Sequence, residues 1–336
     1  MSGAACFLAG DIGATKTVLA LVTAAGGARR PVLTRTFQSA DYPSLEVIIG
    51  EFLARSTATV ERATFGVAGP VIDQRVQITN RLWGVDGRSV GAHLGGVPVH
   101  LLNDLEALGH SVLQLQEQDL VTLNAGVRDP HGTIGIVAPG TGMGEGFLVW
   151  DGKGHRPCVS EGGHSDFAPN NDVELALLGY LMARFGHVSV ERVCSGLGLP
   201  NIYAFLRDTS RESAPEWLEK ELDTAADATP VIVGAALDDA RACSIAKRTL
   251  GIFVDVLAAE AGSFAVRLLA TAGMYLGGGI PPRILGMMTD PRFMSVFLAK
   301  GRLRPVLMGV PVFVINNRDA GLLGASQHVL TGHSSK

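Results

Sequence analysis

The chain has little cysteine, and its cysteines are widely separated. Its 336 residues include four of them, with no CxxC pair and none of the spacings that zinc sites use. A disulfide-stapled miniprotein and a zinc-ribbon domain are therefore excluded. Single, scattered thiols are typical of a reducing compartment, so we expect a cytoplasmic protein.

An excess of positive charge and a long hydrophobic run are also missing. Lysine and arginine number 28 against 32 aspartates and glutamates, and the net charge of −4 is spread without blocks, which argues against nucleic-acid binding. The first basic residue is Lys16, and Asp11 interrupts the only early apolar stretch, so the N-terminus lacks the form of a signal peptide. No uncharged run reaches the ~18 residues of a membrane span. We expect a soluble protein with neither nucleic acid nor membrane as a partner.

Two common nucleotide-binding motifs are absent. The only Gly-Lys pair, Gly152-Lys153, is followed by glycine, so there is no GxxxxGK[ST] loop, and GxGxxG does not occur. P-loop and Rossmann sites are thereby excluded. The chain does have 42 glycines scattered through a sequence that is 47% hydrophobic. This composition predicts a globular protein with many tight turns, and the length predicts about two domains.

The hydrophobic pattern predicts mixed α/β structure, with helices dominating from about 172 to 272. Strands 6–13 and 17–22 are predicted to form a hairpin, since a glycine turn separates two apolar runs. We expect further strands at 64–68, 97–102, 134–137, 146–150, 274–276 and 310–315, with helices at 44–55 and after 104.

The helical region carries recognisable start and stop signals. Asp172 is predicted to cap a helix that ends at Gly186. Thr229-Pro230 predicts another helix start, and residues 238–269 carry nearly continuous helical periodicity. The residues of the first of these helices that are predicted to point inward are Leu177, Leu178, Leu181, Met182 and Phe185.

Three glycine-dense loops are candidate sites for a nucleotide. In residues 11–17, small residues would let backbone amides approach a phosphate, and Asp11 could hold a hydrated magnesium ion; a simple β-turn is the alternative. Residues 139–144 offer a second set of amides, or else only a hairpin turn. Residues 277–282 follow a strand and could lie against a nucleoside, although a plain turn at the start of a helix is by itself the stronger explanation.

Polar residues at three places are candidates for binding hydroxyl groups. Asn103-Asp104 follows a strand and precedes a helix, a position that ligands favour. The segment 161–169 sets Glu161, His164 and Asp166 around two glycines, which suits sugar hydroxyls; the alternative is a solvated loop in which Asp166 caps backbone. Glu191 is either a further sugar ligand or a first-turn glutamate favoured by a helix dipole.

Taken together and in this order, the segments resemble the bacterial-type ATP-dependent glucokinases of the hexokinase/actin-like ATPase superfamily. The resemblance covers almost the whole chain, and the EGGHxDFAP block at 161–169 is its most specific part. It implies a two-domain α/β fold, hexokinase/actin-like (ribonuclease H-like), with an active-site cleft between the domains. The small domain would be residues 1–115, completed by a C-terminal helix at about 317–331, and the large α+β domain residues 116–316.

The sequence also departs from its relatives in places. The related ROK sugar kinases carry a cysteine-rich zinc motif that this chain lacks, which puts it outside that branch. Ala14 stands where the family usually has a second glycine, and Lys16 stands where bacterial members often have asparagine. Because alanine disfavours positive φ, Ala14 restricts the dihedral angles that the first predicted phosphate loop can adopt.

The resemblance further implies a reaction and a set of site residues. Glucokinase transfers the γ-phosphate of MgATP to the 6-hydroxyl of glucose, giving glucose 6-phosphate and ADP in the first step of glycolysis, and a homodimer is expected. Asp104 would be the base, and Asp11 would orient Mg²⁺ through its water shell, with no direct metal ligand in the protein. The residues expected to hold the sugar are Asn103, Asp104, Glu161, His164 and Glu191. Those expected to hold ATP are Asp11, Gly13, Thr15, Gly140 and Thr141 at the phosphates, and Gly278 and Gly279 at the nucleoside.

Two other functions compete with this one. A non-catalytic sugar sensor could share the fold, but it would need a partner-binding or DNA-binding segment, and the presence of Asp104 favours catalysis. A kinase for mannose or glucosamine, or one that uses polyphosphate, would have the same residue types.

Overall fold

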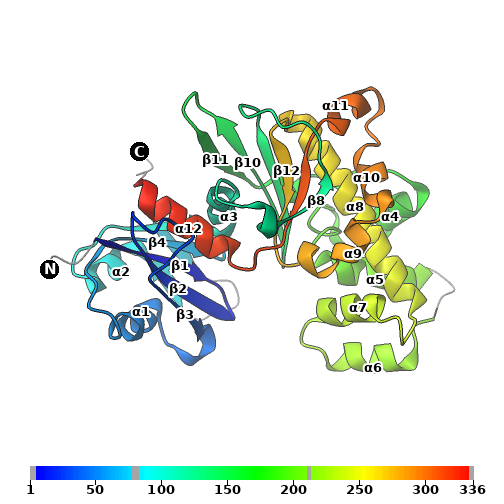
Figure 1. Cartoon of the computed structure of the whole chain (residues 1–336). Helices are drawn as coiled ribbons and strands as arrows, with labels where there is room; N and C mark the ends of the chain where they lie inside the picture. Colours follow the sequence, from blue (N-terminus) through cyan, green and yellow to red (C-terminus); the bar gives the residue numbers. More distant parts are fainter. Residues whose placement is uncertain (1–4, 78–82, 210–212, 333–336) are drawn as a thin grey trace. The chain divides into compact units, whose positions relative to one another are not determined.

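The computed structural model describes residues 5–77, 83–209 and 213–332, and it divides into two compact units (Figure 1). The first unit consists of the chain up to Asp119, the short segment Arg156–Cys158 and the chain from Asn317 onward. The second consists of Leu120–His155 and Val159–Asn316. The chain therefore passes from the first unit to the second after Asp119 and returns after Asn316.

A five-stranded sheet forms the centre of the first unit, in the order β3-β2-β1-β4-β7. Strands β1 (Cys6–Ile12), β2 (Lys16–Val22) and β3 (Leu33–Gln38) pair antiparallel, which confirms the predicted hairpin. Strands β4 (Val60–Val67) and β7 (Val99–Asn103) run parallel to β1. The carboxyl ends of β1, β4 and β7 therefore meet at one edge of the sheet, where ligands of α/β proteins commonly bind.

Helices cover both faces of this sheet, because the side chains of a strand alternate between its faces. Leu8 and Leu19 pack with α1 (Leu45–Leu53) on one face, and Phe7 and Val18 pack with α12 (Ala320–Thr331) on the other. Figure 1 shows α12 beside α3, which spans Asp104–Val112. The remaining elements are η1 (Ser39–Asp41), β5 (Arg75–Gln77), β6 (Gly84–Asp86), α2 (Gly87–His93) and η2 (Glu117–Asp119).

The second unit is built on a six-stranded sheet in the order β11-β10-β9-β12-β13-β8. Its members are β8 (Leu120–Asn124), β9 (Ile134–Pro139), β10 (Met143–Trp150), β11 (His155–Ser160), β12 (Gly273–Leu276) and β13 (Val312–Ile315). The edge strands β8 and β11 were not among the predicted strands. An edge strand is only half covered, so it shows a weak hydrophobic pattern, and β11 contains Pro157.

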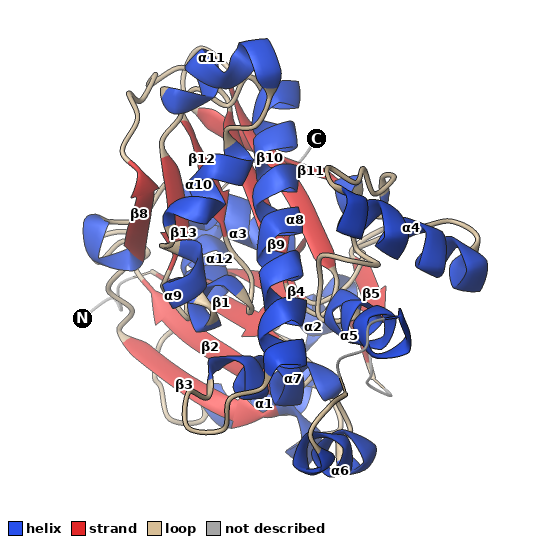
Figure 2. Cartoon of the chain, turned by 90° about the vertical axis from the view of Figure 1, so that its right-hand side faces the viewer, coloured by secondary structure: helices blue, strands red, loops and turns tan. Residues whose placement is uncertain are grey.

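The helices of the second unit pack around one long central helix, α8 (Ser244–Leu268), which lies along β9 and β12 in Figure 2. Among the described residues, α8 alone has the length and composition of a membrane span, but most of its apolar stretch is buried inside the unit. The other helices are η3 (Gly162–His164), α4 (Asp172–Phe185), α5 (Gly198–Thr209), α6 (Glu216–Thr224), α7 (Ala228–Leu237), η4 (Pro281–Arg283), α9 (Leu285–Met288), α10 (Pro291–Phe297), η5 (Gly301–Leu303) and α11 (Arg304–Met308).

Two predictions about α4 were wrong. Its cap is Asn171, whose Oδ1 accepts a hydrogen bond from the Glu174 N–H at 3.0 Å, and Asp172 is already the first helical residue. Met182 and Phe185 are 52% and 37% exposed rather than inward, because the buried stripe runs through Glu174, Leu177 and Leu181 instead. Gly186 does end the helix, with a φ of 73°.

The helix predicted at 238–269 is present as α8, but its predicted start was wrong. Helix α7 ends at Leu237 and α8 begins at Ser244. Between them the Asp238 carboxylate accepts hydrogen bonds from the backbone N–H groups of Ala240 and Arg241, at 2.9 and 3.2 Å. Aspartate competes with the helix for backbone donors in this way, so the periodicity continues although the helix does not.

Candidate active site

Asn103 and Asp104 lie where strand β7 gives way to helix α3. Asn103 is the N-cap, and its Oδ1 accepts a hydrogen bond from the Glu106 N–H at 2.6 Å. Because Oδ1 is used in this way, the amide N–H groups of Asn103 are the ones suited to donate to a ligand. Asp104 opens the helix, and its Oδ1 accepts from the Leu105 N–H at 2.9 Å. Both side chains are therefore held by the local backbone.

Asp11 lies at the same edge of the sheet. In the strand register Ile12 of β1 is level with Val67 of β4, and Val67 is level with Asn103 of β7. Asp11 and Asn103 therefore lie at the carboxyl ends of two parallel strands, with β4 between them. Burial raises the pKa of Asp11 to about 6, and the nearby carboxylates of Asp104 and Asp319 raise it too, while Lys16 opposes them. Three carboxylates are thus gathered around one strand end.

The turn after Asp11 is held by a neighbouring short helix. Gly13 donates its N–H to the Lys16 carbonyl at 3.0 Å, and the Ser39 hydroxyl donates to the Gly13 carbonyl at 2.8 Å. The Ser39 N–H donates to the carbonyl of Thr15 at 2.9 Å. Among the described residues other than glycine, positive φ is confined to Asp73, Gln74 and Leu269. The turn therefore accommodates Ala14 without a left-handed backbone.

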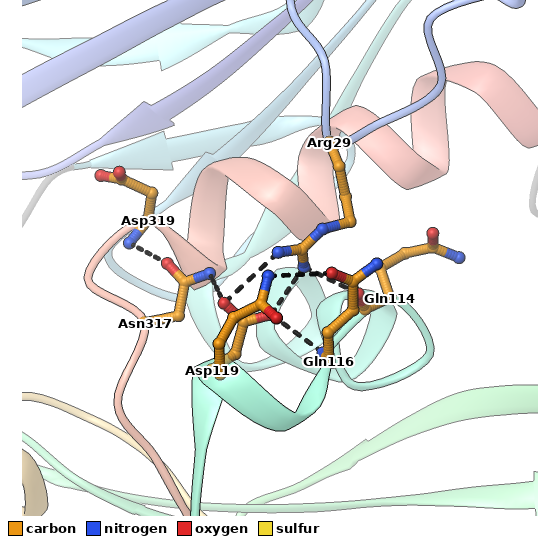
Figure 3. A network of polar contacts seen from close by, with 7 residues as sticks. Arg29, Gln114, Gln116, Asp119, Asn317 and Asp319 are labelled. Carbon is orange, nitrogen blue, oxygen red and sulfur yellow. Dashed lines mark hydrogen bonds and ion pairs between the residues drawn. The ribbon is translucent and has the colours of Figure 1, made fainter.

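A polar network joins Asp319 to the place where the chain leaves the first unit (Figure 3). Arg29 Nη1 donates to Asp119 Oδ2 at 2.6 Å, and Asn317 Nδ2 donates to Asp119 Oδ1 at 2.9 Å. Asn317 Oδ1 in turn accepts from the Asp319 N–H at 2.8 Å. The position of Asp319, and with it the charge near Asp11, is therefore linked to Asp119.

In the second unit the structure brings three predicted sugar residues together. His164 Nε2 lies 3.8 Å from Glu161 Oε2, and His164 Nδ1 lies 4.0 Å from Glu191 Oε1. The Glu191 N–H donates to the Gly163 carbonyl at 2.9 Å, which fixes the two segments side by side. Glu161 and His164 are exposed, so these polar groups are available to a ligand. Asp166 instead pairs with His187 at 2.9 Å.

The two glycine loops predicted in the second unit are adjacent. The Ile280 N–H donates to the Pro139 carbonyl at 3.2 Å, and the Gly140 N–H donates to the Gly142 carbonyl at 2.9 Å. Gly278 has a φ of 81°, and a Cβ there would lie 2.5 Å from the Pro139 carbonyl oxygen, so only glycine fits. Gly278 and Gly279 are exposed beside the loop that carries Gly140 and Thr141.

Glu191 has a second role that its sequence position did not suggest. The N–H of Met143, which directly follows the loop 139–142, donates to Glu191 Oε2 at 3.0 Å. One carboxylate oxygen therefore faces His164, and the other accepts a hydrogen bond from the backbone at the end of the glycine loop. A first-turn glutamate in a helix would do neither, and Glu191 lies outside the helices.

Sequence reasoning missed Asp319 and Glu145. Asp319 follows strand β13 much as Asp104 follows β7, so the same strand-then-carboxylate signal was present at 312–319. Glu145 is fully buried on β10 although the pattern gives no sign of burial. Among the described residues, no cluster of three or more histidines, cysteines or carboxylates has the arrangement of a metal site.

Comparison with known proteins gives a consistent result over nearly the whole chain. The family model described as Glucokinase matches residues 8–331. A glucokinase of Nostoc punctiforme is 39% identical over 95% of this chain and 97% of its own length. The crystal structure of a glucokinase from an Antarctic psychrotroph superimposes with a TM-score of 0.85 at 29% identity, covering 97% of this chain and 99% of that one. A ROK family glucokinase from Streptomyces griseus, in complex with glucose and AMPPNP, shares the fold at a TM-score of 0.64 and 20% identity, covering 97% of this chain and 100% of that one.

Proposed function

The chain belongs to the glucokinase family and phosphorylates glucose with ATP, and we propose that Asp104 is the base of this reaction. The observation that carries the proposal is the placement of Asp104 beside Asn103, at the carboxyl end of β7 and the first turn of α3. A carboxylate held there by the Leu105 N–H is oriented before substrate binds.

The proposed step moves one proton and one phosphoryl group. As the 6-hydroxyl oxygen of glucose bonds to the γ-phosphorus, its proton passes to Asp104. The bond from the γ-phosphorus to the bridging oxygen breaks, and ADP leaves with that oxygen. Asp104 afterwards releases the proton to solvent. Phosphoryl transfer depends mainly on positioning and charge stabilisation, so one aligned base with well-placed amides is a sufficient set of groups.

The remaining hydroxyls of glucose are proposed to bind Asn103, Glu161, His164 and Glu191. The amide of Asn103 can donate, the two carboxylates can accept, and the imidazole can do either. The approach of His164 to both glutamates, within 4.0 Å, supports a shared sugar-binding role for these three.

The phosphates of ATP are proposed to lie against Gly13 and Thr15 of the first unit and Gly140 and Thr141 of the second. Backbone N–H groups in such turns form concave sites for anions. The exposed backbone of Gly278 and Gly279 would receive the nucleoside, since glycine lets a flat group approach closely.

We also propose that Mg²⁺ arrives with ATP and is held near Asp11. The residues fit such an ion, because burial and the carboxylates of Asp104 and Asp319 raise the pKa of Asp11, and a cation would relieve that accumulation of negative charge. When bound, the ion would neutralise charge on the phosphates. Asp11 would orient it through water.

We further propose that the protein is a cytoplasmic homodimer that acts at the first step of glycolysis. Scattered single cysteines support the location. The homodimer is proposed from the family resemblance alone. Light scattering coupled to size-exclusion chromatography tests it, because a dimer has twice the mass of the chain.

A coupled assay for ADP release tests the function. Purified protein is offered glucose, mannose or glucosamine, each with ATP or polyphosphate as the donor. We expect turnover to be highest with glucose and ATP. Glucose binding without ADP release would favour the sugar-sensor function, and preference for another hexose or for polyphosphate would change the proposed substrate.

A further inference from the structure

Glu145 is a buried carboxyl group to which the proposed mechanism gives no role. It lies on β10, opposite Val137 of β9, and its side chain is 0% exposed. Within the described part of the chain, neither Oε1 nor Oε2 accepts a hydrogen bond from a donor group, and the side chain it meets is the carboxylate of Glu260. A buried carboxylate without partners is costly, because it loses hydration and gains nothing in return. Such a group is better tolerated in its neutral, protonated form.

Glu145 also lies directly beneath the loop that carries Glu161 and His164. A Cβ at Gly162 would collide with Oε2 of Glu145, so the carboxyl group is packed against this loop. The Ser160 hydroxyl donates to the Glu145 carbonyl at 2.8 Å and accepts from the Gly162 N–H at 3.2 Å. Both the side chain and the backbone of Glu145 therefore support Gly162, between two residues proposed to bind glucose.

The ionisable groups that interact with Glu145 come from two other segments. Glu260 and Arg267 of α8 form an ion pair with each other, and Cys194 lies three residues after Glu191. Lys300, which precedes η5, is a neighbour of Glu260 and Arg267. Burial, then the charge of Glu260 and a hydrogen bond with its carboxylate, raise the pKa of Glu145 to about 8, while Arg267 lowers it. Burial followed by Glu260 and Glu145 raises the pKa of the Cys194 thiol, and burial lowers the pKa of Lys300. Since Arg267 is paired with Glu260, Glu145 has a neighbouring negative charge and no cation of its own among these groups.

We propose that Glu145 is a positioning residue that acts as an uncharged acid, supporting Gly162 so that Glu161 and His164 are held for glucose. Ionisation would place a second negative charge beside Glu260 and beneath the loop, and the loop would shift to admit water. Glucose affinity therefore depends on the proton of Glu145, whereas ATP affinity does not. This inference rests on the proposed sugar-binding role of Glu161 and His164.

The test is the dissociation constant of each substrate as a function of pH. Calorimetric titrations of glucose and of a nonhydrolysable ATP analogue are made from about pH 6.5 to 9.5 on wild type, Glu145→Gln and Glu174→Gln. Glu174 is a matched control, since it is a buried glutamate of the same unit whose oxygens bond Asn170 and Asn171. In wild type and the control, the Kd for glucose should rise about tenfold for each pH unit above the pKa of Glu145. In Glu145→Gln that rise should be absent.

A second measurement needs no variant. Glucose titrations of wild type at about pH 8.5, in buffers of different ionisation enthalpy, should show uptake of a sizeable fraction of one proton on binding. No proton uptake, an unchanged alkaline rise in Glu145→Gln, or an equal rise for the ATP analogue would overturn the proposal. If the protein phosphorylates glucose but its Kd for glucose does not change with pH, only the role proposed for Glu145 is wrong. If it does not phosphorylate glucose, the proposed function is wrong.

Discussion

Asn317 donates a hydrogen bond to Asp119 at 2.9 Å, although 198 residues separate them in the sequence. These are the residues at which the chain leaves the first unit and returns to it. Arg29 binds the same carboxylate at 2.6 Å, and the hydrogen bond and charge of Arg29 lower the pKa of Asp119 although burial opposes this. Asp119, the last residue before the chain first enters the second unit, is thereby bonded to Asn317, the first residue after its final return.

Asp119→Asn should destabilise the protein by ~1–3 kcal/mol, because the charge that Arg29 meets in a half-buried site is lost. The free energy of unfolding in urea measures this. Glu216→Gln is the control, since its pair with Lys220 is highly exposed and should be worth less than ~1 kcal/mol. Equal urea midpoints for wild type and Asp119→Asn would contradict the role given to this network.

Gly278→Ala should weaken ATP binding more than glucose binding and lower stability. Alanine would have to adopt a φ of 81° while its Cβ met the Pro139 carbonyl, so the two glycine loops would separate. At Gly279 the nearest atom to a Cβ is Arg283 Nη1 at 3.8 Å, so Gly279→Ala is a matched control with little expected effect on stability. Titrations with both substrates test the effect of Gly278→Ala on binding. Thermal unfolding compares the two variants, and a similar loss of stability in both would contradict the steric role given to Gly278.

His164→Ala should weaken glucose binding by ~1–3 kcal/mol and leave ATP binding nearly unchanged. Glu191 differs, because its Oε2 also accepts from Met143 beside the phosphate loop. Glu191→Gln keeps an acceptor for that N–H and should act mainly on glucose, whereas Glu191→Ala should weaken both substrates. Equal effects of the two Glu191 variants on ATP affinity would remove the proposed link between the sugar and phosphate sides.

Glu145 should also make stability depend on pH. Its folded-state pKa is raised to about 8, whereas glutamate in an unfolded chain titrates near ~4.3. Between these values the folded protein keeps a proton that the unfolded chain has lost, so the free energy of unfolding falls as pH rises. Glu145→Gln removes this contribution. The melting temperature of the variant minus that of wild type should therefore increase from about pH 5 to pH 8 and then stay constant. A difference in melting temperature that does not change with pH would show that Glu145 is not a buried, neutral acid.

Local patterns predicted the parts of the site that depend on local structure. Asn103 and Asp104 could be placed because a strand run and a helix start adjoin there, and both signals lie within a few residues. Gly278 could be singled out because a glycine run after a strand marks a turn. The exposure of Met182 and the start of α8 at Ser244 were missed, since periodicity alone does not say where a helix begins or which face meets its neighbour.

The rest depends on contacts between distant segments. Nothing near Arg29, Asp119 or Asn317 in the sequence indicates that they meet, because the sheet and α12 bring them together. Glu145 was missed for a different reason: glutamate in a strand is ordinarily expected at the surface, so its burial has no local signature.

Asp104 is the central residue of the proposed mechanism, and single-turnover phosphoryl transfer in Asp104→Asn tests its role as the base most directly. Glu106→Gln, on the same turn of α3, is the control for loss of a nearby carboxylate. We expect Asp104→Asn to bind glucose with near wild-type affinity while the rate of transfer falls by ~10²–10⁴, and the control to keep most of its rate. A transfer rate close to that of wild type in Asp104→Asn, with glucose bound, would contradict the account.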